Sequence, residues 1–270
     1  MKTIFVLISL YLLVSVFSPC PKITPVSNEI LNGYATRYWD CCKPHCAWAS
    51  NAGSNIIGGG TKTKMCNFDQ EFITKGTSAC DGGPATACYT QIPFTIDGCE
   101  YGFAFAAAPA ISGRTCGKCY RLDLETNKTL IVMANNIGYD VEGGQFDLMI
   151  PGGGVGLFNG CKNWDQSKMG EQYGGLLSLC GDGEVECLRE KCADAFSNDA
   201  KAKEGCLFLA DFLDAADNPK LTYQQVECPD VLNNPPYCSP ILLESQFLHP
   251  LNKPTPPPGI IKSNCPPSTS

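Results

Sequence analysis

Histidine is scarce in this chain of 270 residues, in which only His45 and His249 occur. Two histidines leave little material for a zinc site built from His and Cys ligands. They also limit serine hydrolase chemistry, which needs a base beside its nucleophile, and the Gly-x-Ser-x-Gly motif is absent. We therefore expect no metal site, and we set serine-type catalysis aside.

The chain also lacks a long basic run and a complete nucleotide-binding motif. Its net charge is −7, with 27 acidic and 20 basic residues, which argues against a nucleic-acid partner. The segment 151–156 (PGGGVG) is rich in glycine but lacks the Gly-Lys-Ser/Thr ending of a phosphate-binding loop. We interpret it as a tight loop and expect no cofactor.

Only one long apolar run is present, at the N-terminus. It covers Ile4–Phe17, follows Lys2 and precedes Ser18. This run is shorter than the ~20 residues that a membrane-spanning helix needs, and the pattern is typical of a secretory signal peptide. We assign residues 1–20 to the signal, expect cleavage between Ser18 and Thr24, and predict a secreted protein with no membrane segment afterwards.

Cysteine, in contrast, is abundant, with 18 residues. In a secreted chain so many cysteines predict structural disulfides, including the adjacent Cys41 and Cys42, which otherwise resemble a metal or redox motif. Cys20 is expected to leave with the signal, and Cys265 lies in a polar tail. Setting these two aside leaves 18 − 2 = 16 cysteines, enough for eight bridges.

The dense cysteine, glycine and aromatic content covers residues 25–245, which we interpret as one domain. Residues 249–270 are rich in Pro, Ser and Thr and are expected to be extended or disordered. Alternation and apolar runs predict strands, and a 3.6-residue period predicts helices over 184–196 and 204–216. The expected strands cover residues 120–124, 130–134, 146–150 and 221–226. This mixture indicates a mainly β fold, a barrel with inserted loops and a few short helices.

The remaining candidates for chemistry are carboxylates surrounded by aromatic residues, as in glycoside hydrolysis. Asp40 lies between Trp39 and a run of three cysteines, so its backbone should be rigid. Asp147 follows Phe146, where partial desolvation would raise its pKa as a general acid requires. The residues alone do not pair these two carboxylates among 27 acidic side chains.

A resemblance pairs them. The segment 36–41 (TRYWDC) resembles the signature of glycoside hydrolase family 45, the small inverting endoglucanases, and residues 146–161 (FDLMIPGGGVGLFNGC) resemble the family's second block. The resemblance extends from about Tyr34 to Cys228 and includes further stretches at 173–175, 216–219 and 225–228. It implies a six-stranded double-psi β-barrel with long disulfide-linked loops, crossed by an open groove, and a β-1,4-glucan substrate.

The same resemblance implies roles for individual residues. Asp40 matches the catalytic base, Asp147 the general acid and Asp140 an assisting carboxylate, while Tyr38 matches a residue beside the cleavage point. Trp48 and Lys43 lie on the same rigid segment as Asp40 and are candidates for lining the groove. One departure is Gln145, which stands where many members carry His.

Two other classes stay open. An expansin-like wall-loosening protein shares the barrel and a Phe-Asp pair but lacks the base, so Asp40 is the discriminating residue. A secreted inhibitor or structural protein would explain the cysteines but not both motifs. We expect a monomeric endo-1,4-β-glucanase whose preference among cellulose, mixed-linkage glucan, xyloglucan and mannan is open.

Overall fold

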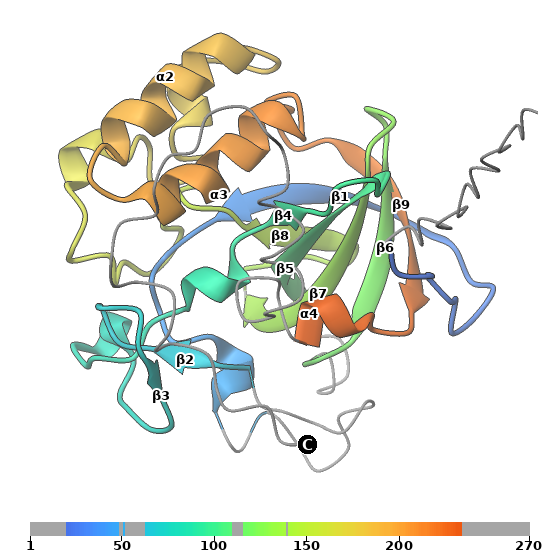
Figure 1. Cartoon of the computed structure of the whole chain (residues 1–270), viewed down its shortest axis with the longest axis horizontal. Coiled ribbons are helices and arrows are strands. Elements are labelled where there is room, and N and C mark those ends of the chain that lie inside the picture. The colour runs from blue at the N-terminus through green and yellow to red at the C-terminus, as the bar shows by residue number, and fades with distance from the viewer. Residues whose placement is uncertain (1–19, 49–50, 52–62, 110–115, 139, 234–270) are drawn as a thin grey trace, which may run out of the picture.

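The computed structural model describes residues 20–48, 51, 63–109, 116–138 and 140–233, and its central feature is a closed barrel (Figure 1). The strands follow the order β5-β7-β6-β9-β1-β8, and β8 pairs with β5 to close the ring. This confirms the predicted mainly β fold with a six-stranded barrel. The barrel strands are β1 (Leu31–Tyr38), β5 (Tyr101–Pro109), β6 (Cys119–Leu124), β7 (Thr129–Gly138), β8 (Gln145–Met149) and β9 (Lys220–Val226).

Shorter elements surround the barrel. Figure 1 shows α2 (Val185–Ala195) and α3 (Ala200–Asp211) side by side on one side of it. The pair β2 (Met65–Cys66) and β3 (Phe72–Ile73) forms a separate hairpin. The other short elements are β4 (Phe94–Thr95), α4 (Asp230–Asn233) and the 3-10 helices η1 (His45–Ala47), η2 (Ala79–Asp81), η3 (Tyr89–Gln91), η5 (Gln166–Lys168) and η6 (Leu177–Leu179).

The four predicted strands are confirmed as β6, β7, β8 and β9, with β7 longer than expected. Strands β1 and β5 were not predicted. The β5 sequence is rich in alanine, which favours helices in isolation, but β5 pairs in parallel with β7 and is almost wholly buried. Its small residues let α3 approach closely, since a Cβ added at Gly102 would lie 2.7 Å from Phe208 Cζ. Tertiary packing therefore overrides the local preference.

Helix α2 agrees with its predicted range to within a residue at each end, but the predicted range 204–216 for the next helix is wrong at both ends. Helix α3 begins at Ala200 because the side chain of Asp199 caps it, accepting a hydrogen bond from the backbone N–H of Ala202. It ends at Asp211, and Asp214 and Ala215 then adopt φ of 55° and 52°. Such left-handed backbone cannot continue a right-handed helix.

Successive residues of each strand point to opposite faces of the sheet, as the pleat requires, and both faces contribute to the core. Leu130 and Val132 of β7 belong to one buried cluster, whereas Ile131 and Met133 belong to another. The first cluster draws residues from all six barrel strands and from both α2 and α3. The continuous apolar run at 130–134 is thus buried on both faces, as predicted.

Eight disulfides link the described residues. The number agrees with the prediction, but the set of cysteines differs, because Cys20, which was set aside, pairs with Cys99. Cleavage before Cys20 would keep this bridge in the mature chain. Cys265 and the predicted tail lie outside the described residues. The described part of the chain contains no helix with the length and apolarity to cross a bilayer.

Candidate active site

The two predicted catalytic aspartates are brought together by the pairing of β1 with β8. These strands are parallel neighbours, and the register places Thr36 opposite Asp147. Asp40 follows two residues after the end of β1, where the chain leaves the barrel. Both carboxylates are partly buried. A pairing between segments more than a hundred positions apart thus creates the site.

The backbone around Asp40 is held on several sides. Its carboxylate Oδ1 accepts a hydrogen bond of 2.8 Å from the backbone N–H of Cys42, and its carbonyl oxygen accepts one of 2.7 Å from Gly160. The next residue, Cys41, has a left-handed φ of 56° and is bonded to Cys161, while Cys42 is bonded to Cys80. Rigidity at Asp40 was predicted from the cysteine run, and the structure shows how the cysteines provide it.

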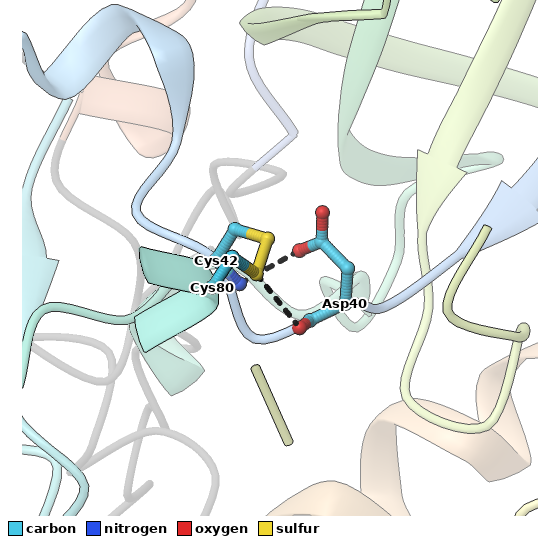
Figure 2. A group of neighbouring side chains, drawn as sticks. All are labelled: Asp40, Cys42 and Cys80. Atoms are coloured by element: carbon cyan, nitrogen blue, oxygen red, sulfur yellow. Dashed lines mark hydrogen bonds between the residues drawn. A yellow bond between two sulfur atoms is a disulfide. The ribbon is translucent and has the colours of Figure 1, made fainter. Parts of the chain in front are cut away.

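Figure 2 shows Asp40 beside the disulfide between Cys42 and Cys80. Among the described residues, this trio is the one cluster with metal-ligand geometry. Its two sulfurs are bonded to each other and therefore supply no thiolate, the form in which cysteine binds metals. Cys80 Sγ lies 3.7 Å from the Asp40 carbonyl oxygen as a packing contact. This cluster supports the carboxylate and does not form a metal site.

Asp147 receives its hydrogen bond from the opposite strand. The Thr36 hydroxyl donates to Asp147 Oδ1 over 2.7 Å. The Gln145 amide nitrogen donates to the Thr36 oxygen over 2.9 Å, and the Tyr34 hydroxyl donates to Gln145 Oε1 over 3.0 Å. The four side chains form one chain of hydrogen bonds along β1 and β8.

Burial raises the pKa of both aspartates. For Asp40, desolvation raises the pKa to about 7. The Asp140 charge also raises this pKa, whereas the hydrogen bond from the Cys42 N–H lowers it. For Asp147, desolvation again raises the pKa to about 7. The Thr36 hydrogen bond and the Arg37 charge lower it, while the charges of Asp140 and Asp40 raise it. Near neutral pH the pair as a whole therefore retains about one proton.

Asp140 and Tyr38 both interact electrostatically with Asp40 and Asp147. Asp140 is exposed, and its charge acts on both Asp40 and Asp147. Tyr38 is buried, and desolvation together with the three carboxylates raises the pKa of its phenol well above the usual range. The structure thus brings Tyr38, Asp40, Asp140 and Asp147 together.

Trp48 and Lys43 form a pair of their own. The Lys43 ammonium lies 3.8 Å from the centre of the Trp48 ring and donates to the Gly76 carbonyl oxygen. Trp48 is 37% exposed and so is not a core residue. An exposed indole is suited to stacking against a sugar ring, but the role of both residues in substrate binding stays a prediction, as does the open groove.

Sequence reasoning missed the side chains that support the carboxylates. Asn136 of β7 donates to the Tyr38 hydroxyl over 2.8 Å and accepts a bond of 2.7 Å from the His45 backbone N–H. It therefore links Tyr38 to the turn that carries Trp48. The only sequence signal for this group was Gln145, noted as a departure from the usual His, while Asn136 and Tyr34 had none.

A further aromatic contact involves Trp39, the residue before Asp40. Trp39 stacks on Trp164 with a centroid distance of 6.4 Å, and the Trp164 indole N–H donates to Asp199, the N-cap of α3. The Tyr89 hydroxyl donates to the same carboxylate. Trp164 therefore connects the Asp40 segment to α3.

Two desolvated carboxylates of raised pKa that a closed β-barrel holds close together can serve as the proton donor and the proton acceptor of an acid–base hydrolase. The model of glycosyl hydrolase family 45 matches residues 32–239, most of the chain. The chain therefore belongs to glycosyl hydrolase family 45.

Individual relatives agree with this assignment. The chain is 38% identical over 229 residues to Endoglucanase B of Cellvibrio japonicus, covering 73% of this chain and 43% of that protein. It thus spans less than half of that relative's length. It is 34% identical over 236 residues to an endoglucanase of Cryptopygus antarcticus, covering 83% and 96% of the two chains. The crystal structure of the Cryptopygus cellulase superposes with a TM-score of 0.63 at 33% identity, covering 75% of this chain and 93% of that one.

Proposed function

We propose that the protein is a secreted, monomeric endo-β-1,4-glucanase that hydrolyses internal bonds of cellulose or a related glucan with inversion, with Asp40 as general base and Asp147 as general acid. The observation that carries this proposal is the pair of partly buried carboxylates with pKa values near 7. The relatives' names as endoglucanases support the substrate class, and the eight disulfides support an oxidising, extracellular location.

The two environments support the division of roles. The backbone N–H of Cys42 stabilises the ionised form of Asp40, which a base needs. The charges of Asp140 and Asp40 favour the protonated form of Asp147, which an acid needs, against the Thr36 hydrogen bond and the Arg37 charge, which favour the ionised form. When the pair holds one proton and Asp40 is ionised as the base, that proton is on Asp147.

In the proposed reaction, Asp40 takes a proton from a water molecule as the water oxygen bonds to the anomeric carbon. The bond from that carbon to the glycosidic oxygen breaks, and this oxygen takes the proton of Asp147. Exchange with solvent then returns a proton to Asp147 and removes one from Asp40. Because a water must fit between the base and the sugar, we expect the carboxyls to be ~6.5–9.5 Å apart, wider than the ~5–5.5 Å of a retaining pair.

The stereochemistry of the first product tests this proposal. Proton NMR of a cellohexaose digest should show the α-anomer appearing first from the β-linked substrate. Asp40→Asn and Asp147→Asn should each lower kcat by ~10²–10⁴-fold. Asp97→Asn, at an exposed aspartate away from the site, is the matched control and should keep full activity.

Initial formation of the β-anomer would overturn the assignment of Asp40 as base. Substantial turnover by Asp40→Asn would argue against Asp40 as the base, whereas binding of cello-oligosaccharides without any turnover by the native protein would favour an expansin-like, non-catalytic function. A hydrolysis screen over cellulose, mixed-linkage glucan, xyloglucan and mannan would define the preferred polymer.

A further inference from the structure

Gln145 lies in a position that fixes the direction of a hydrogen-bond chain ending on Asp147. Its Oε1 accepts from the backbone N–H of Glu142 and from the Tyr34 hydroxyl, both over 3.0 Å. A backbone N–H can only donate, so the amide atom facing it must be the oxygen. The amide nitrogen of Gln145 is therefore the atom that faces Thr36, 2.9 Å away.

This orientation determines where the Thr36 proton points. The Thr36 oxygen accepts the N–H of Gln145, so its own proton is directed to its other partner, Asp147 Oδ1, at 2.7 Å. Asp147 Oδ1 is then an acceptor in both protonation states of the carboxyl. The proton that Asp147 transfers must be carried by Oδ2, on the side away from Thr36.

We propose that Gln145, held in place by Tyr34, is a positioning residue that keeps the transferable proton of Asp147 on Oδ2 by directing the Thr36 hydroxyl to Oδ1. The inference rests on the proposed function, since it takes Asp147 as the general acid. Gln145 acts through Thr36 and does not touch the reacting atoms.

The chain of hydrogen bonds that ends on Asp147 keeps its donor-to-acceptor direction over the pH range in which the aspartates titrate. Gln145 and Thr36 do not titrate in this range, and burial together with the Glu142 and Asp147 charges raises the pKa of Tyr34 above its usual range, so Tyr34 stays a donor. The titratable and charged groups that act on Asp147 itself are Asp40, Asp140, Arg37, Tyr34 and Tyr38. A His in the place of Gln145 would add a group that titrates near neutral pH.

The test compares two substrates that differ in their need for an acid. Cellohexaose releases a sugar alkoxide that must be protonated, whereas a 2,4-dinitrophenyl β-cellotrioside releases a phenolate that leaves without a proton. Gln145→Met keeps the side-chain volume but removes the amide, so Thr36 becomes free to accept the proton of Asp147. We expect kcat on cellohexaose to fall on the order of 10-fold, part of the ~10²–10⁴ that a general acid contributes. KM should be unchanged, and kcat on the dinitrophenyl substrate should change less than about 2-fold.

Further variants separate positioning from folding. Gln145→His restores a donor toward Thr36 and should recover part of the activity on cellohexaose, and Tyr34→Phe, which leaves the Glu142 anchor, should give a smaller loss with the same substrate dependence. Tyr223→Phe on the neighbouring strand β9 is the matched control and should leave both substrates unaffected. The alkaline limb of the pH profile should move up in Gln145→Met, because the hydroxyl that donates to ionised Asp147 is no longer directed there.

Four outcomes are decisive. Equal losses on both substrates would show a merely structural role for Gln145, and no loss on either would show no role, and each result overturns the inference. If Asp147→Asn is inactive on cellohexaose while Gln145→Met behaves like the native protein, the proposed function stands and only the inference fails. If Asp147→Asn retains full turnover, the acid assignment itself fails, and this inference with it.

Discussion

The carbonyl oxygen of Asp40 accepts a hydrogen bond of 2.7 Å from the backbone N–H of Gly160. The next residues along the two segments, Cys41 and Cys161, are joined by a disulfide. One step further, Cys42 is joined to Cys80. The proposed base thus stands where two loops converge, and covalent bonds hold it there more directly than the barrel strands do.

Removing the Cys42–Cys80 bridge should therefore reduce activity more than removing a bridge elsewhere. The double variant Cys42→Ser, Cys80→Ser opens a loop with a sequence separation of 38, worth roughly 4 kcal/mol of unfolding free energy. It also frees the backbone N–H that binds Asp40. We expect a lower melting temperature together with a fall in kcat measured well below that temperature.

The matched control is Cys180→Ser, Cys187→Ser, which removes the bridge between the loop before α2 and the first turn of α2. This bridge has a sequence separation of 7 and is worth roughly 2 kcal/mol. It should lower the melting temperature with little effect on kcat. An equal fall in kcat for both double variants would contradict a specific role of the Cys42–Cys80 bridge at Asp40.

The raised pKa of Asp147 predicts how stability depends on pH. The unfolded chain loses this proton near pH 3.8, whereas the folded protein keeps it until about pH 7. The folded state thus binds more protons in between, so its stability falls as pH rises from about 4 to about 7. Asp147→Asn removes this loss and should melt at least ~2–4 °C higher than the native protein at pH 8, the shift given by about 1 kcal/mol, but not at pH 4.

Asp123 provides a control of opposite sign. Partial burial raises its pKa, but hydrogen bonds from Arg121 and Thr129 lower it below the usual value overall. Its contribution is present above the pKa of the unfolded chain and is lost as pH falls. Asp123→Asn should therefore reduce the melting temperature at pH 8 and have little effect at pH 3. The same pH dependence in both variants would contradict the assigned shifts.

Asp140 is predicted to tune the pH profile through its charge. That charge raises the pKa of both Asp40 and Asp147, so Asp140→Asn should move both limbs of the kcat/KM profile to lower pH, on the order of 0.5 unit. Glu190→Gln, on the exposed side of α2, is a carboxylate of the same charge away from the site and should leave the profile in place. A loss of kcat with both limbs unmoved would instead indicate a direct role for Asp140 in the reaction.

Gly102 is predicted to be essential for the contact between β5 and α3. An added Cβ would lie 2.7 Å from both Phe208 and Phe212 and 2.8 Å from Leu130. Gly102→Ala should therefore lower the free energy of unfolding by ~1–3 kcal/mol, measured by chemical denaturation. Gly143→Ala is the control, because its Cβ would meet nothing within 4 Å. A neutral Gly102→Ala would show that α3 can move away without loss.

Several features could be predicted because their signals are local. The alternation over 120–124 and the apolar run over 130–134 predicted β6 and β7, and the 3.6-residue period predicted α2. The features that failed depend on distant partners. Alanine-rich β5 is a strand because β7 and β8 lie on either side of it, and α3 begins early because Asp199 caps it. Cys20 was set aside because it lies at the end of the predicted signal peptide, and nothing near it in the sequence indicates Cys99 as its partner.

The sequence by itself determined the chemical inventory of the site. It placed Asp40 in a rigid run of cysteines and Asp147 beside an apolar residue, it offered few histidines, and through its motifs it indicated the family. Only the tertiary structure decided how these groups act on one another. The parallel register of β1 and β8 places Thr36 against Asp147, and burial raises both pKa values to about 7. The physical reason is that strand pairing and desolvation arise from long-range packing, which a local pattern of residues does not encode in readable form.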